Sequence, residues 1–215
     1  MRLNQPKKNP FLWAIIIGIF VVFAWFEGSI FGNIEKIKDR EGISQSITEV
    51  KIGGPFNLID HRGNSVTEKS FQDRHKLVFF GYTWCPDICP TELQIITEVL
   101  DTLGNNSKKI AALFITIDPR RDTQVKLANY LSHFHPEIIG LTGNEKQIAT
   151  AAKAYRVYYN RPDQNTKTVS SQSSDDYIMD HSVYIYLISP EDKYITHFIQ
   201  SDDSDKIAQE ILNHL

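Results

Sequence analysis

The most hydrophobic segment of the chain lies near its N-terminus. Residues 11–26, FLWAIIIGIFVVFAWF, form an uninterrupted apolar run that follows a basic tail containing Arg2, Lys7 and Lys8. Its length lies between a signal-peptide core of about 7–15 residues and a full membrane span of about 20. Because the run ends in aromatic residues rather than a small-residue cleavage site, an uncleaved anchor is favoured over a signal peptide. A buried core helix is the alternative, but such a helix rarely follows a basic tail.

The charges around this run predict its orientation and the location of the protein. The basic flank should remain in the cytoplasm, so the rest of the chain should lie across the membrane. We therefore expect a cytoplasmic tail over 1–10, a transmembrane helix over 11–27, a linker over 28–50 and a folded domain over 51–215. No Arg- and Ser-rich amphipathic leader precedes the run, which favours a bacterial inner membrane with the domain in the periplasm over an organelle.

Beyond residue 50, strand-like and helix-like hydrophobic patterns alternate. The predicted strands cover 52–60, 65–67, 76–81, 110–118, 138–142, 156–160, 182–188 and 193–199. The predicted helices cover 90–103, 122–135, 144–155 and 203–215, and the polar segment 162–176 should be an exposed loop. The first two strands read as a hairpin, and the alternation that follows predicts an α/β domain with a mostly parallel sheet covered on both faces.

Composition narrows the functional classes. The chain has 215 residues, of which 41% are hydrophobic, 23% charged and 11% aromatic, so it is an ordinary globular chain rather than a disordered or multi-span membrane protein. A net charge of −3 gives no electrostatic reason to expect a nucleic-acid partner. Only two cysteines occur, Cys85 and Cys89, so the fold cannot depend on a disulfide framework. This local pair is therefore the first candidate for chemistry.

Both cysteines lie between the end of a buried strand and the start of a helix, where open α/β sheets place their sites. Pro86 or Pro90 could be the first helical residue, and Pro90 is favoured because a proline disfavours α conformation in the residue before it. In either case the positive end of the helix lies near the sulfurs. That field lowers the thiol pKa and favours the thiolate, the form that acts as nucleophile and metal ligand.

The spacing of the two cysteines leaves several roles open. Three residues separate them, whereas thioredoxin-like oxidoreductases have two. On one regular helix their Cβ atoms would be about 5–6 Å apart, wider than the roughly 3.5–4.5 Å of a relaxed disulfide. The spacing mildly favours a shared metal ion and leaves reversible oxidation open. The alternative, two structural core cysteines, fits poorly with the surrounding prolines and helix start.

A metal would need a third ligand from elsewhere in the fold. Of the seven histidines, His181 stands out because it follows the polar loop, opens a strand and has Asp180 beside it. From its position alone it remains one candidate, since a lone histidine is more often structural. Two thiolates with one imidazole suit Cu(I) or Zn(II), and three-coordinate binding fits Cu(I) well, whereas zinc would want a fourth ligand.

Three segments in this order resemble the Sco/SenC family of membrane-anchored, thioredoxin-like copper proteins. They are residues 80–90 (FGYTWCPDICP), 116–123 (TIDPRRDT) and 177–190 (YIMDHSVYIYLISP), and the resemblance extends from about Gly53 to the C-terminus. It implies a thioredoxin-like fold, with a central mixed sheet flanked by helices and an extra N-terminal hairpin, behind one N-terminal transmembrane helix. Glu191-Asp192 departs from the Asp-Gly that the family often has in its closing hairpin, which puts only the turn geometry in question.

The resemblance also implies a site. It makes Cys85, Cys89 and His181 ligands of copper, as Cu(I) or Cu(II). It places Asp118 near the site, although a turn aspartate at a strand end is an equal reading.

The implied function is a copper metallochaperone for the binuclear copper centre of cytochrome c oxidase. Its partners would be the copper-bearing oxidase subunit and a copper donor protein, and no enzymatic activity is required. The alternative is a thiol-disulfide reductase in which Cys85 and Cys89 reduce the cysteines of that subunit. A peroxide-handling protein that needs only one of the cysteines is a third possibility.

Overall fold

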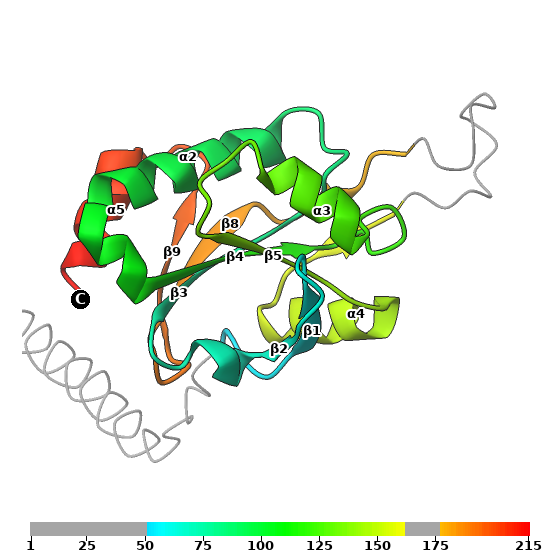
Figure 1. The fold of residues 1–215 in the computed structure, drawn as a ribbon, viewed down its shortest axis with the longest axis horizontal. Helices are drawn as coiled ribbons and strands as arrows, with labels where there is room; N and C mark the ends of the chain where they lie inside the picture. Colours follow the sequence, from blue (N-terminus) through cyan, green and yellow to red (C-terminus); the bar gives the residue numbers. More distant parts are fainter. Residues whose placement is uncertain (1–50, 162–176) are drawn as a thin grey trace, which may run out of the picture. The chain divides into compact units, whose positions relative to one another are not determined.

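A seven-stranded sheet, in the order β2-β1-β5-β4-β3-β8-β9, forms the centre of the domain (Figure 1). The computed structural model describes residues 51–161 and 177–215. The expected tail, transmembrane helix and linker, and the loop over 162–176, lie outside these residues. Within the described residues, no helix combines the length and apolar character needed to cross a membrane.

Each strand and helix expected from the hydrophobic pattern has a counterpart in the structure, and several of them are shorter than expected. The strands of the main sheet are β1 Asn57–Asp60, β2 Ser65–Thr67, β3 His75–Gly81, β4 Ile110–Thr116, β5 Ile138–Thr142, β8 Tyr184–Ile188 and β9 Tyr194–Ile199. A second, two-stranded sheet pairs β6 Tyr159–Asn160 with β7 Asp180–His181. The α-helices are α2 Ile88–Leu103, α3 Gln124–Leu131, α4 Glu145–Ala154 and α5 Ser204–Leu212, and two 3-10 helices cover Glu68–Phe71 and Gly104–Lys109.

The sheet is mixed, so the expectation of a mostly parallel sheet was wrong. Among the described strands, only the β3-β4 and β4-β5 pairs are parallel, and these are the pairs joined by helical crossovers. The predicted hairpin β1-β2 and the hairpin β8-β9 extend the two sides of this centre, and all their pairings are antiparallel. Figure 1 shows α2, α3 and α5 on one face and α4 on the other. Covered on both faces, β3 and β4 are buried along almost their whole length.

The start of α2 differs from the prediction in a way that matters for the site. The helix begins at Ile88, with Asp87 as its N-cap, rather than at Pro90. Pro90 is accommodated as the third helical residue because the N–H groups of the first turn have no partner within the helix. Cys89 therefore lies inside the helix and Cys85 outside it, so the spacing estimated for one regular helix does not apply.

The β8-β9 turn accommodates Asp192 at the position where the family often has glycine. Asp192 has a φ of 62°, in the left-handed region that glycine adopts readily and aspartate tolerates. Its carboxylate lies 2.8 Å from the ammonium of the fully buried Lys76, which also donates a 3.1 Å hydrogen bond to the carbonyl of Ser189. Asp192 thus adopts a conformation that also suits glycine, and its side chain forms an ion pair with β3.

Candidate metal centre

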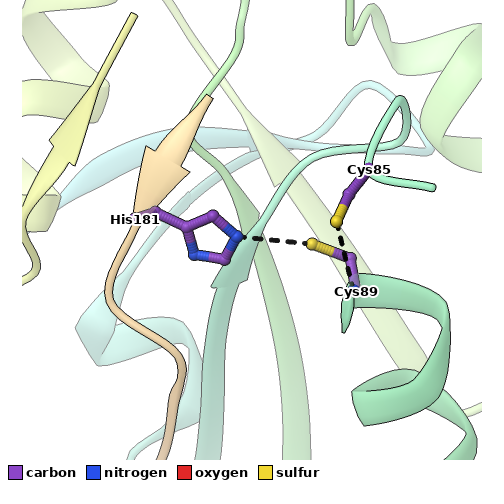
Figure 2. Close-up of side chains that lie close together, drawn as sticks. All are labelled: Cys85, Cys89 and His181. Atoms are coloured by element: carbon purple, nitrogen blue, oxygen red, sulfur yellow. Dashed lines mark hydrogen bonds between the residues drawn. The ribbon is translucent and has the colours of Figure 1, made fainter. Parts of the chain in front are cut away.

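Two segments far apart in the sequence bring three potential metal ligands together. Cys85 lies in the loop after β3, Cys89 in the first turn of α2 and His181 on β7. Their ligand atoms all lie within 4.8 Å of one another, and Cys89 Sγ is 3.6 Å from His181 Nε2 (Figure 2). The structure therefore places the three residues singled out in the sequence at one point, and with these separations the two sulfurs and the imidazole could converge on a single ion.

Space for the Cys89 sulfur is provided by Gly81, the last residue of β3. A Cβ at that position would lie only 2.9 Å from Cys89 Sγ and 2.8 Å from Cε2 of Phe114. Cys89 itself is fully buried. This role of Gly81 was not predicted from the sequence, although the glycine lies within the segment that carries the cysteines.

The two thiols differ in their tendency to ionise. Hydrogen bonding from the Cys89 side chain lowers the pKa of the half-buried Cys85 to about 5, against the opposing effect of burial, with the N–H groups of Cys89, Asp87 and Ile88 contributing. The backbone N–H of Cys89 lies 3.4 Å from Cys85 Sγ. The pKa of Cys89 is raised by its hydrogen bond to Cys85 and by burial. At neutral pH, Cys85 is therefore the thiolate and Cys89 the thiol.

His181 is oriented by its own neighbours. Its Nδ1 lies 2.9 Å from the carbonyl of Ser182, and because a carbonyl can only accept, Nδ1 carries the proton. In the neutral imidazole, Nε2 is then the nitrogen that is free to bind a metal, and it lies 3.6 Å from Cys89 Sγ. The ring of Tyr82 contacts the imidazole edge to face, with the centroids 5.8 Å apart.

Asp118 lies in the β4-α3 loop and is not one of the three grouped ligands. Its buried carboxylate forms an ion pair with Arg121 and accepts a 2.8 Å hydrogen bond from the hydroxyl of Tyr177. Neither Arg121 nor Tyr177 was predicted from the sequence as part of the site, although both lie within the motifs that carry the family resemblance. Their position within these motifs was the one feature of the sequence that could have indicated a role at the site.

A second buried carboxylate, Asp122, fixes the start of the cysteine loop. It accepts hydrogen bonds from the backbone N–H of Thr83 at 3.0 Å, the hydroxyl of Thr83 at 2.6 Å and the hydroxyl of Thr116 at 2.6 Å. Burial raises the pKa of Asp122, whereas these hydrogen bonds oppose the shift. The loop before Cys85 is thereby tied to the end of β4.

Comparison with known proteins identifies the family. The model of the SCO1/SenC family matches residues 44–215. The chain belongs to the SCO1/SenC family. The thioredoxin-like fold expected from the resemblance, with a mixed sheet and flanking helices, is thereby confirmed.

Individual SCO1/SenC relatives agree over most of the chain. Protein sco1 of Schizosaccharomyces pombe is 38% identical over 191 residues, which cover 88% of this chain and 70% of that protein. The structure of Bradyrhizobium japonicum ScoI with copper bound is 40% identical, with a TM-score of 0.69, covering 76% of this chain and 99% of that one. Yeast Sco1 with copper bound is 38% identical, with a TM-score of 0.68, covering 76% and 88%.

Proposed function

We propose that this protein is a membrane-anchored copper metallochaperone that assists assembly of the binuclear copper centre of cytochrome c oxidase. Cys85, Cys89 and His181 hold the copper. The observation that carries the proposal is the convergence of two thiols and one imidazole within 4.8 Å, in a chain similar to ScoI and Sco1 structures described as copper-bound.

The chemistry of the ligands suits copper as cargo. Soft thiolates with one imidazole favour Cu(I), and Cys85 already supplies one thiolate at neutral pH. Copper binding displaces the proton of Cys89, because a metal binds the thiolate rather than the thiol. Cys85 and His181 are only partly buried, so the ligands of a partner can reach the ion and take it by exchange.

The proposed partners follow from the family resemblance. Copper arrives from a donor protein and leaves to the copper-bearing subunit of the oxidase. The apolar run within residues 11–27 anchors the chain in a bacterial inner membrane, with the N-terminus in the cytoplasm and residues 51–215 in the periplasm.

Anaerobic titration with Cu(I) against a chromophoric chelator tests this site. One copper should bind per chain. Cys85→Ser and Cys89→Ser should abolish tight binding, and His181→Ala should weaken it by at least roughly tenfold. The matched control is His197→Ala, which removes an exposed histidine whose ring contacts the hydroxyl of Tyr194 instead. Unchanged affinity in His181→Ala would exclude the assigned site.

The difference between the two thiols supports a second candidate function, thiol-disulfide reduction of the acceptor subunit. The Cys85 thiolate attacks a disulfide of the acceptor, forming a mixed disulfide and releasing one acceptor thiolate, which takes up a proton. Cys89 then loses its proton and attacks the sulfur of Cys85, which releases the second acceptor thiol. The acceptor gains two electrons and two protons, and Cys85 and Cys89 become a disulfide.

Copper-free protein mixed with an oxidised acceptor subunit distinguishes the two functions. Reduction predicts two new acceptor thiols per chain, and Cys89→Ser should accumulate the mixed disulfide at Cys85. If no acceptor thiols appear without copper, while copper transfer proceeds, the metallochaperone function alone remains.

A further inference from the structure

His181 lies on a strand that is not part of the main sheet. Within the described residues, β7 pairs only with β6, with Tyr159 opposite His181 and Asn160 opposite Asp180. The backbone N–H of Ser182 adds a 2.9 Å hydrogen bond to the carbonyl of Tyr158. Such a short ladder is marginal by itself, so other contacts must fix the segment that carries the histidine.

Arg121 provides such contacts at the start of this segment. Its Nη1 donates a 2.9 Å hydrogen bond to the carbonyl of Tyr177, and its guanidinium carbon lies 3.6 Å from the centroid of the Tyr177 ring. The same guanidinium forms an ion pair with Asp118, whose carboxylate accepts a 2.8 Å hydrogen bond from the hydroxyl of Tyr177. Arg121, Asp118 and Tyr177 thus contact one another pairwise, and Arg121 and Asp118 are almost fully buried. We call these three residues the arginine clamp.

The arginine clamp also reaches the segment that carries the cysteines. The guanidinium carbon of Arg121 lies 5.7 Å from the centroid of the Tyr82 ring. It lies 5.4 Å from the centroid of the ring of Trp84, the residue before Cys85. The hydroxyl of Tyr82 accepts a 3.1 Å hydrogen bond from the N–H of Met179. The clamp therefore lies between the two parts of the chain that supply the ligands.

We propose that Arg121 and Tyr177 are positioning residues that hold segment 177–181 against the cysteine loop and so keep His181 Nε2 beside Cys89 Sγ. Lysine cannot replace Arg121 in this role, because a single ammonium lacks the planar fork that bonds Asp118 and Tyr177 together and stacks on an aromatic ring. The effect on copper rests on the proposed function, whereas the effect on segment 177–182 does not.

Amide hydrogen exchange on the copper-free protein tests the clamp directly. In Arg121→Lys, the amides of Met179 and Ser182 should exchange at least tenfold faster than in the wild type, while the amide of Phe114 in the central strand β4 stays protected. Tyr177→Phe, which loses the hydroxyl bond to Asp118 but keeps the ring that stacks on Arg121, should show a smaller increase in the same places. The control is Ile178→Ala, which truncates a side chain that is 66% exposed within the same segment. Wild-type exchange of Met179 and Ser182 in Arg121→Lys would overturn the clamp.

Copper affinity then tests whether the clamp acts through His181. Arg121→Lys should weaken Cu(I) binding roughly 10- to 100-fold, as loss of residues that orient metal ligands generally does. In a His181→Ala background the same substitution should have almost no further effect, because the ligand that it positions is gone. An equal loss in both backgrounds would refute positioning of His181. A wild-type protein that binds no copper would refute the proposed function, while the exchange rates would still decide the clamp.

Discussion

Gly81→Ala tests whether copper binding depends on the space that β3 leaves for the sulfur of Cys89. Gly81 does not have a positive φ, so alanine causes no backbone strain and acts only through its added methyl group. That carbon would lie 2.9 Å from Cys89 Sγ, 2.8 Å from Phe114 Cε2 and 3.1 Å from Phe79 Cε1. Non-bonded carbon atoms prefer about 3.5–4.0 Å, so each neighbour must retreat by roughly 0.4–0.7 Å.

Two consequences follow, one for stability and one for the site. Because all three neighbours are fully buried in a close-packed core, overpacking should cost about 1–3 kcal/mol. In a domain of this size each kcal/mol lowers Tm by about 2–4 °C. A metal site tolerates ligand displacements of only about 0.2 Å, so a shift of about 0.6 Å at Cys89 Sγ should weaken Cu(I) binding by at least roughly tenfold.

The assay pairs thermal unfolding with Cu(I) competition, and Gly140→Ala is the matched control. A Cβ at residue 140 would lie 2.6 Å from Leu131 Cδ1 and 3.6 Å from His61 Cβ, so it overpacks β5 without touching a sulfur. Gly140→Ala should lower Tm and keep the copper affinity of the wild type. Gly81→Ala with wild-type copper affinity, or an equal loss of affinity in Gly140→Ala, would refute the reasoning.

Three further predictions concern ionisable groups. Because the pKa of Cys85 is lowered to about 5, its alkylation by iodoacetamide should stay fast from pH 8 to pH 6 and fall to half near pH 5; a midpoint near pH 8.5 would contradict this. Asp192→Asn should leave the buried ammonium of Lys76 without its ion pair and lower the free energy of unfolding in urea by about 3 kcal/mol. Adding Lys76→Met should restore most of that stability, because the unpaired charge is then removed. A change below about 1 kcal/mol in the single variant would exclude a strong pair. Burial, aided by the charge of Asp202, raises the pKa of Glu92 from the usual 4.5 to about 7, so the folded state binds the proton more tightly than the unfolded state. The free energy of unfolding should therefore fall by up to about 3 kcal/mol as pH rises from about 4.5 through 7, and Glu92→Gln should remove that slope; an unchanged slope would contradict it.

Local hydrophobic patterns predicted the positions of most strands and helices. Burial of a strand on both faces, and the amphipathicity of a helix, determine which positions in the sequence are apolar. β5 was predicted with its observed bounds, and α4, expected over 144–155, covers Glu145–Ala154, where the side chain of the N-cap Asn144 accepts a hydrogen bond from the N–H of Gln147. The pattern did less well at boundaries that depend on contacts outside the segment. β4 ends at Thr116 rather than at residue 118. There the hydroxyl of Thr116 accepts a hydrogen bond from the N–H of Asp118 and donates one to the carboxylate of Asp122.

The direction of the strands was also beyond the local pattern. Strands that belong to hairpins and strands joined by helical crossovers have similar apolar runs. The antiparallel pairing of β3 with β8 could therefore not be predicted from the sequence of either strand alone. Register and direction depend on which partner a strand meets, and that is a property of the whole sheet.

The sequence by itself determined the chemistry available to this protein: two thiols in one strand-to-helix loop, a histidine far along the chain and a family whose motifs contain all three. Only the tertiary structure decided their geometry. It brings His181 Nε2 to within 3.6 Å of Cys89 Sγ, makes Cys85 rather than Cys89 the thiolate, and places Arg121 between the two segments. The physical reason is that distances, burial and hydrogen bonds between residues about 90 positions apart arise only when the sheet and its loops have folded.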